Sequence, residues 1–158
     1  MGSGSRSVEV VRSVLAEAGL ECPVLELPAS TRTSAEAARA IGCSVGQIAK
    51  SIVFRGAWSG SGVLVVASGS NRISEKVVAE RVGEPVEMAP PTFVREVTGF
   101  AIGGVPPFGL RDKLAVFIDE DLLGFDEMWA AAGTPHAVVR LTPAELTSLT
   151  GGTVVKIA

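Results

Sequence analysis

Two runs of aliphatic residues, separated by a glycine- and serine-rich stretch, constrain the fold of this chain more than any other feature. Lys50 to Phe54 (Lys-Ser-Ile-Val-Phe) and Val63 to Ala67 (Val-Leu-Val-Val-Ala) have the length and the β-branched content of buried strands. The residues between them, from Gly56 to Gly62, are of the kinds that favour turns. The pattern therefore predicts a hairpin of two buried strands.

The remaining segments alternate irregularly between helical and extended patterns. Further strands are expected at 24–27, 115–118, 138–141 and 154–157. Helices are expected at 8–18, 33–42, 44–47, 74–82, 91–97 and 144–149, several with a capping residue at the start or a glycine at the end. This irregular order favours a mixed sheet in an α/β (α+β) domain over a doubly wound parallel sheet.

Composition excludes several classes of protein. Of the 158 residues, 47% are hydrophobic and 20% are charged, which is the balance of a globular chain with room for one domain. No apolar stretch approaches the ~20 residues of a membrane helix, and the start lacks the apolar segment of a signal peptide. We therefore expect a flexible tail over residues 1–6, one domain over 7–158 and a cytoplasmic location.

Charge and metal-binding residue types exclude further functions. The net charge of −3 argues against the basic field that non-specific nucleic-acid binders use. With one histidine, no CxxC spacing and no Walker A or Rossmann motif, we expect neither a metal nor a cofactor. Cys22 and Cys43 are most simply interpreted as reduced, buried, small apolar residues.

The segment from Gly103 to Gly109 (Gly-Gly-Val-Pro-Pro-Phe-Gly) has the composition of a stiff loop that a ligand can approach closely. Glycines permit close approach, and prolines fix their own φ and remove their own N–H groups. Such a loop can present its other amides to a carbonyl or an oxyanion. The alternative is a simple connection between a helix and a strand, because glycine and proline mark turns in general.

Lys50 stands where a short helix is expected to pass into an apolar strand. One interpretation is a solvated lysine at a strand end. The other is a cation at the rim of a pocket, facing a phosphate or a developing negative charge.

Two apparent catalytic patterns do not fit their surroundings. Gly42 to Gly46 matches G-x-S-x-G, but that motif needs a preceding strand, and here a helix precedes Ser44, which is better used as a helix cap. His136 and Cys43 have no evident catalytic partners. The acidic residues 119–121 follow a strand, where they suit the start of a helix.

Five segments, read together, resemble one family. They are Leu27–Thr33, Gly46–Phe54, Thr98–Gly109, Val116–Asp119 and Trp129–His136. In this order they look like the YbaK/EbsC family, also called the prolyl-tRNA editing or aminoacyl-tRNA deacylase family, over nearly the whole chain from about Ser7. The resemblance implies a single domain with a curved mixed sheet flanked by short helices.

The resemblance also implies a function, which is hydrolysis in trans of mischarged aminoacyl-tRNA. Synthetase pockets separate small amino acids by only about 1–3 kcal/mol, so a second, hydrolytic sieve is needed. Members of the family hydrolyse the ester with water, assisted by the 2′-hydroxyl of the terminal adenosine, without a side-chain nucleophile. Small residues on proline tRNA, as in Cys-tRNA(Pro) or Ala-tRNA(Pro), are the expected substrates.

The resemblance assigns roles to particular residues of this chain. The catalytic set is Lys50, Gly103, Gly104, Val105 and Pro107, with the lysine on a phosphate or developing charge and the loop amides on the carbonyl. The substrate-binding set is Pro28, Ser51, Phe108, Gly109, Asp119, Gly133, Thr134 and His136.

Two departures from the family pattern leave a second function open. Many relatives carry histidine where this chain has Leu110, and the loop around Pro28 lacks a polar pocket residue found in some editing domains. The alternative is a module that binds the CCA end of aminoacyl-tRNA, or a synthetase, without turnover. A limited rim of basic residues would suffice for a single-stranded end. Candidates for this rim are Arg32, Arg39, Arg72, Lys76 and Arg111.

Overall fold

The predicted hairpin forms the middle of the molecule. The computed structural model describes residues 3–28, 30–31 and 33–158. Strands β2 (Ile48–Gly56) and β3 (Gly62–Ser68) pair antiparallel from Ala49 opposite Ser68 to Arg55 opposite Gly62. Residues 63–68 of β3 are all buried, because helices cover both faces of the sheet at this point.

The sheet is mixed, as predicted. The other strands are β1 (Val24–Glu26), β4 (Val86–Met88), β5 (Ala115–Asp119), β6 (Met128–Ala131), β7 (Ala137–Leu141) and β8 (Thr153–Val155). Their order is β1-β7-β6-β2-β3-β5-β8, with β4 paired to β2. The pairs β2–β6, β3–β5 and β5–β8 are parallel, and the others are antiparallel.

One edge of β2 is shared by two short strands that leave a gap between them. At one end β6 pairs with Ile48 and Ala49, and at the other end β4 pairs with residues 54–56. The Ala89 amide adds a hydrogen bond of 3.0 Å to the Val53 carbonyl. Along this edge no strand in the described part of the chain pairs with residues 50–52.

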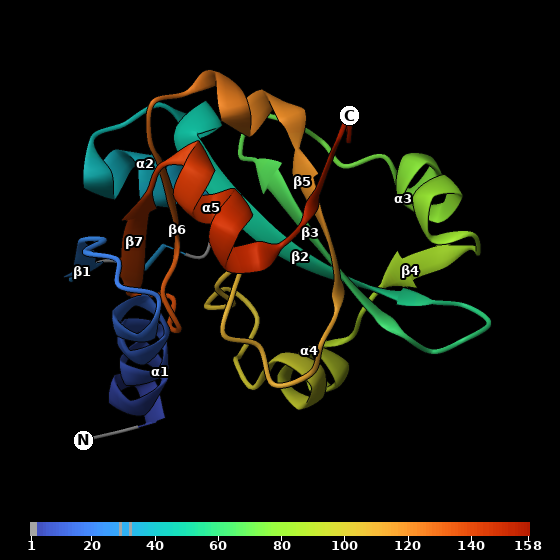
Figure 1. Cartoon of the computed structure of the whole chain (residues 1–158), viewed down its shortest axis with the longest axis horizontal. Coiled ribbons are helices and arrows are strands. Elements are labelled where there is room, and N and C mark those ends of the chain that lie inside the picture. The colour runs from blue at the N-terminus through green and yellow to red at the C-terminus, as the bar shows by residue number, and fades with distance from the viewer. Residues whose placement is uncertain (1–2, 29, 32) are drawn as a thin grey trace.

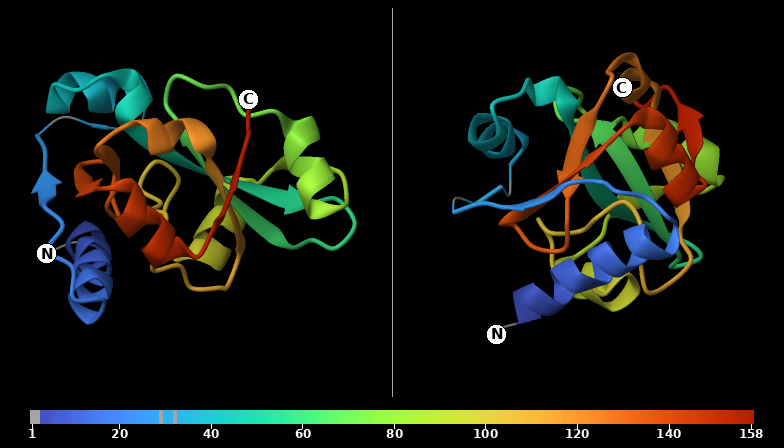
Figure 2. Two further views of the ribbon diagram at one scale, coloured as in Figure 1. Left: turned by 45° about the horizontal axis from the view of Figure 1, so that its top comes forward. Right: turned by 60° about the vertical axis from the view of Figure 1, so that its left-hand side comes forward.

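Helices cover both faces of the sheet (Figures 1 and 2). They are α1 (Ser3–Glu17), α2 (Ser34–Ile41), η1 (Val45–Gln47), α3 (Glu75–Val82), α4 (Pro91–Thr98), η2 (Glu120–Gly124) and α5 (Pro143–Thr150), where η marks a 3-10 helix. Residues of α1, α4 and α5 form the main core with Leu64 and Val66, and α3 packs on the opposite face against Val63 and Val65. Ala37 and Ala38 of α2 pack against Trp129 of β6.

The predicted helix signals are largely confirmed. Thr33 caps α2 by accepting from the Glu36 amide, and Thr142 forms a capping box with Glu145 at the start of α5. Among the described residues no helix is long and apolar enough to cross a membrane.

Some boundaries differ from the prediction. Helix α1 begins at Ser3, inside the stretch expected to be a tail, and residues 1–2 lie outside the described residues. The last strand, β8, ends at Val155, short of the predicted 157. Strands β4 and β6 were not predicted, because runs of three or four residues show too little periodicity to separate a strand from a loop.

Candidate functional site

A cavity of about 290 Å³ opens at the gap in the edge of β2. Residues 48–53 form one wall, and the turn around Gly103 faces them. The described residues that line it are Thr31, Thr33, Ser34, Ala37, residues 48–53, Met88, Ala89, Val94, Ile102, Gly103, Val105, residues 129–131 and Val138. The described lining is mostly apolar and contains no carboxylate, histidine or cysteine.

Lys50 lies in β2 and lines this cavity, and its ammonium group is held by a hydrogen bond to a neighbouring loop. Its Nζ donates a hydrogen bond of 2.6 Å to the main-chain carbonyl of Asn71. The Asn71 side-chain amide in turn donates to Asp119 Oδ2 at 2.8 Å and to Asp121 Oδ2 at 2.7 Å. The ammonium group is therefore attached through Asn71 to a pair of carboxylates.

Asp119 anchors this arrangement. Its side chain is 1% exposed and accepts from the main-chain amides of Ser68 and Asp121, both at 3.0 Å. It also caps η2, which agrees with the predicted start of a helix after the strand. Asp119 does not line the cavity, so it acts on the cavity through Asn71 and Lys50.

The surroundings of Lys50 change the balance between its charged and neutral forms. Burial lowers its pKa from the ordinary value of 10.5, and the Asp119 carboxylate opposes this effect in part. An ammonium group that is partly removed from water interacts more strongly with a nearby anion than one on the open surface. Lys50 is therefore suited to hold a phosphate or a developing negative charge.

Ser51 places a buried polar group, without a partner among the described residues, in the cavity wall. Its buried Oγ has no hydrogen-bond partner in the described structure. Its main chain faces the unpaired edge of β2, because strand alternation places it on the same side as the Val53 carbonyl. Buried polar groups are nearly always satisfied in proteins, so this hydroxyl is available to a water molecule or to a bound polar group.

The turn opposite β2 offers two free amides. Gly103 and Val105 line the cavity, and neither main-chain N–H has an acceptor within the described residues. The Gly104 amide donates to the Ala101 carbonyl at 3.0 Å, so it is already used inside the turn. Gly103 has a φ of +87°, which requires glycine for an unstrained turn at this position.

Gly104 and Gly133 have a packing role. A Cβ added to Gly104 would lie 2.7 Å from the Cα of Thr134, and one added to Gly133 would lie 2.6 Å from the main-chain oxygen of Ser7. The Gly133 amide also donates to the Gly104 carbonyl at 3.0 Å. The 133–134 loop is therefore in direct main-chain contact with both the 103–105 turn and α1.

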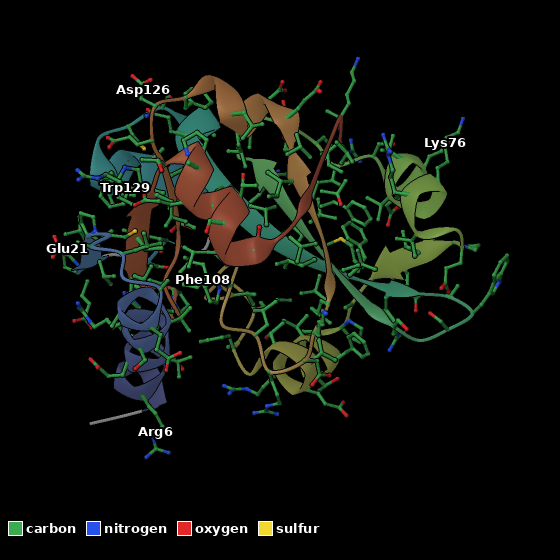
Figure 3. All side chains as sticks on the ribbon, viewed as in Figure 1. Arg6, Glu21, Lys76, Phe108, Asp126 and Trp129 are labelled. Carbon is green, nitrogen blue, oxygen red and sulfur yellow. The ribbon has the colours of Figure 1, made fainter. Side chains whose placement is uncertain are left out.

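Several residues assigned from the resemblance lie outside the cavity lining. Phe108, which is labelled in Figure 3, belongs to the main core, Pro107 is buried, and Gly109 lies near Val14. Thr134 accepts from the His136 amide at 3.2 Å. Pro28 is exposed, as is His136, and their direct contact with substrate stays a prediction.

The segment around His136 nevertheless supports the cavity. The His136 carbonyl accepts from the Leu27 amide at 2.6 Å, and the Pro135 carbonyl accepts from Thr31 Oγ1 at 2.7 Å. Thr31 lines the cavity, so these contacts fix the position of one wall.

Ser44, the two cysteines and Leu110 do not contribute a catalytic group to the cavity lining. Ser44 follows a helix and shares a hydrogen bond with Gln47, so the nucleophile-elbow pattern is absent. Both cysteines are free and half-buried, and burial raises the pKa of each thiol, to about 11 for Cys22. Leu110 packs against the main core outside the cavity lining.

The basic rim is only partly described. Arg39, Arg72, Lys76 and Arg111 are exposed, and Arg32 lies outside the described residues. No group of three or more histidine, cysteine, aspartate or glutamate residues in the described part could hold a metal ion.

Sequence reasoning did not identify Asn71, Met88, Ala89, Ile102 or Trp129. Asn71 acts on Lys50 through its main-chain oxygen, which leaves no mark in the sequence. The other four are apolar residues that look like ordinary core or surface positions until the fold brings them around one space.

Comparison with known proteins identifies close similarities. Residues 28–149 match the model of a family described as the aminoacyl-tRNA editing domain. The chain is 37% identical to the uncharacterized protein YwhH of Bacillus subtilis (strain 168) over 140 residues, which is 89% of this chain and 88% of that protein. It is 29% identical over 116 residues to the "Putative Cys-tRNA(Pro)/Cys-tRNA(Cys) deacylase EbsC" of Enterococcus faecalis (strain ATCC 700802 / V583), covering 73% of this chain and 70% of that protein.

A solved structure has a similar fold. A protein described as "a putative trans-editing enzyme for prolyl tRNA synthetase" superimposes with a TM-score of 0.89 at 50% sequence identity, over 96% of each chain.

Proposed function

Since the chain belongs to the aminoacyl-tRNA editing domain family, we propose that it is a trans-editing hydrolase that removes a small amino acid from mischarged tRNA. The observation that carries this proposal is that Lys50, Ser51, Gly103 and Val105 line one cavity, and that the Ser51 hydroxyl and the Gly103 and Val105 amides have no partner within the described residues. Deacylation of aminoacyl-tRNA is the activity common to the family, and the named relatives point the same way.

The proposed mechanism needs no nucleophile from the protein. The ester carbonyl lies against the amides of Gly103 and Val105, which stabilise the oxyanion that forms. A water oxygen, assisted by the 2′-hydroxyl of the substrate, bonds to the carbonyl carbon. The bond from that carbon to the ribose 3′ oxygen then breaks, and the oxygen leaves with a proton. Lys50 holds the terminal phosphate or the developing charge.

The cavity lining favours a small, uncharged amino acid. Val53, Ala89, Val94 and Val105 present apolar surface, and the described lining holds no carboxylate to pair with a basic side chain. We propose alanine or cysteine on proline tRNA as the substrate. Discrimination by such a pocket is worth about 1–3 kcal/mol per methylene.

The test is single-turnover deacylation of a panel of mischarged tRNAs by the purified protein. Lys50→Ala is expected to lose on the order of 10²-fold or more in rate if the ammonium stabilises the transition state. Lys156→Ala, at an exposed lysine outside the cavity lining, is the matched control and should keep the wild-type rate. Equal rates for wild type and Lys50→Ala would refute the assigned role.

The same experiment decides between the enzyme and a non-catalytic module. A module would bind the CCA end, or a synthetase, and release the aminoacyl-tRNA intact. The main reason to consider it was Leu110, which packs against the core away from the cavity lining. Catalysis is therefore favoured. We propose the cytoplasm as the site of action, and a synthetase as a further partner to be tested by co-purification.

A further inference from the structure

A second hollow lies directly beside the cavity and shares part of its wall. It measures about 290 Å³ and is lined by Lys50, Ile52, Phe54, Arg72, Ile73, Glu75 and Met88. Lys50, Ile52 and Met88 line both spaces. We call this second space the Arg72 groove. Lys50 stands at the boundary between the groove and the cavity.

The Arg72 groove combines apolar surface with positive charge. Met88 is 63% exposed, so its apolar side chain is open to solvent beside the cations. Arg72 is exposed and has no ion-pair partner within the described residues. Glu75 is the single acidic residue of the lining, against two cations. Proteins that hold single-stranded RNA combine cations for the backbone with side chains that cover the base faces, usually aromatic rings. Here Ile73 and Met88 offer aliphatic surface for a base.

The chemistry of the substrate requires a path for the chain that precedes the terminal adenosine. An aminoacyl-adenosine in the cavity remains joined through its 5′ phosphate to the penultimate nucleotide. The groove adjoins the cavity at Lys50, the cation proposed above to face that phosphate. Asn71, which holds Lys50, is the neighbour of Arg72 in sequence, so one short segment carries both Arg72 and the contact to Lys50.

We propose that the Arg72 groove binds the penultimate nucleotide of the tRNA acceptor end. Its base lies against Ile73 and Met88, and its phosphodiester is held by Arg72. This inference rests on the proposed function, because it takes the terminal aminoacyl-adenosine to occupy the adjoining cavity.

The test compares two substrates that differ only in the nucleotides before the terminal adenosine. Single-turnover rates are measured with alanyl-tRNA(Pro) and with 3′-alanyl-adenosine for wild type, Arg72→Ala, Arg72→Lys and Arg81→Ala. Arg81 is the matched control, since it is an exposed arginine in the last turn of α3 and lies outside the groove lining.

We expect Arg72→Ala to lower kcat/KM on the tRNA roughly 10-fold or more, because a hydrogen bond to a charged group contributes about 1.5–3 kcal/mol. Its rate on alanyl-adenosine should stay at the wild-type level, and Arg72→Lys should recover part of the loss. The salt dependence of binding should flatten by about 0.7 in log–log slope for one lost phosphate contact. Equal losses on both substrates, or an equal loss in Arg81→Ala, would overturn the proposal.

A binding measurement separates failure of the groove from failure of the proposed function. A fluorescent oligoribonucleotide ending in CCA is titrated against the same variants and against Glu75→Gln. Arg72→Ala should weaken binding, and Glu75→Gln should strengthen it at low salt because a carboxylate no longer faces the phosphate. If wild type hydrolyses no aminoacyl-tRNA, the proposed function is refuted. The groove is tested separately, by the affinities of the variants for the oligoribonucleotide. Unchanged affinity in both variants would refute the groove.

Discussion

Replacing Gly104 by alanine is the sharpest test of how the 103–105 turn is positioned. The new Cβ would lie 2.7 Å from the Cα of Thr134, whereas ordinary van der Waals contact begins near 3.4 Å. The atoms that it meets belong to the main chain and cannot rotate away, so the turn must move by roughly 0.7 Å. Overpacking of this kind costs about 1–3 kcal/mol. The amides of Gly103 and Val105 move with the turn.

A displacement of this size should be visible in catalysis as well as in stability. A 1 Å misplacement of a catalytic group can cost about 10²-fold, so we expect Gly104→Ala to lose roughly 10- to 100-fold in single-turnover deacylation. Thermal unfolding should show a lower Tm. Gly124→Ala is the control, because a Cβ there meets nothing within 4 Å and the backbone is not left-handed. A Gly104→Ala variant with wild-type rate and Tm would refute the proposed position of the turn.

Four further predictions follow from the contacts around Lys50 and from one helix cap. Lys50→Met should lose activity without a lower Tm at neutral pH, because burial penalises the charged lysine in the folded state; differential scanning fluorimetry checks this. The wild-type kcat/KM should fall on the alkaline side with a midpoint below pH 10.5, as the lowered pKa releases the Lys50 proton early, and the pH profile of Lys50→Met should lack this limb. Asp119→Asn should destabilise the fold by about 1–3 kcal/mol in chemical denaturation, since buried donors lose a charged acceptor. Thr142→Ala should cost about 1 kcal/mol in the same assay by removing the α5 cap, with no change in deacylation.

Local signals in the sequence predicted the elements that depend on neighbouring residues. The β2–β3 hairpin follows from two aliphatic runs around a turn-forming stretch, and the capping box at Thr142 follows from residues three positions apart. Short strands such as β4 and β6 depend on a partner strand far away in the chain. Nothing in three or four residues indicates that partner.

The candidate site could be predicted only in part, for a related reason. Family resemblance brought Lys50 and the 103–105 turn together, and the structure places them around one cavity. The resemblance could not say that Gly104 and Gly133 contact other main-chain segments, because a glycine required for packing and one required for ligand access look alike in a sequence. Nor could it show that Asn71 holds Lys50, since the contact uses a main-chain oxygen.

Because the edge of β2 is divided, the polar groups of the pocket and the side chains that shape its opening come from different strands. The strand itself carries Lys50 and Ser51, while Met88 and Ala89 reach the opening from β4 and the residues that follow it. Because β4 is short and pairs only with residues 54–56, its side chains can be changed while the register of β2 with β3 and β6 stays intact. Selectivity for the amino acid can therefore be re-engineered at Ala89, in the laboratory or by natural variation, without a change to Lys50 or Ser51.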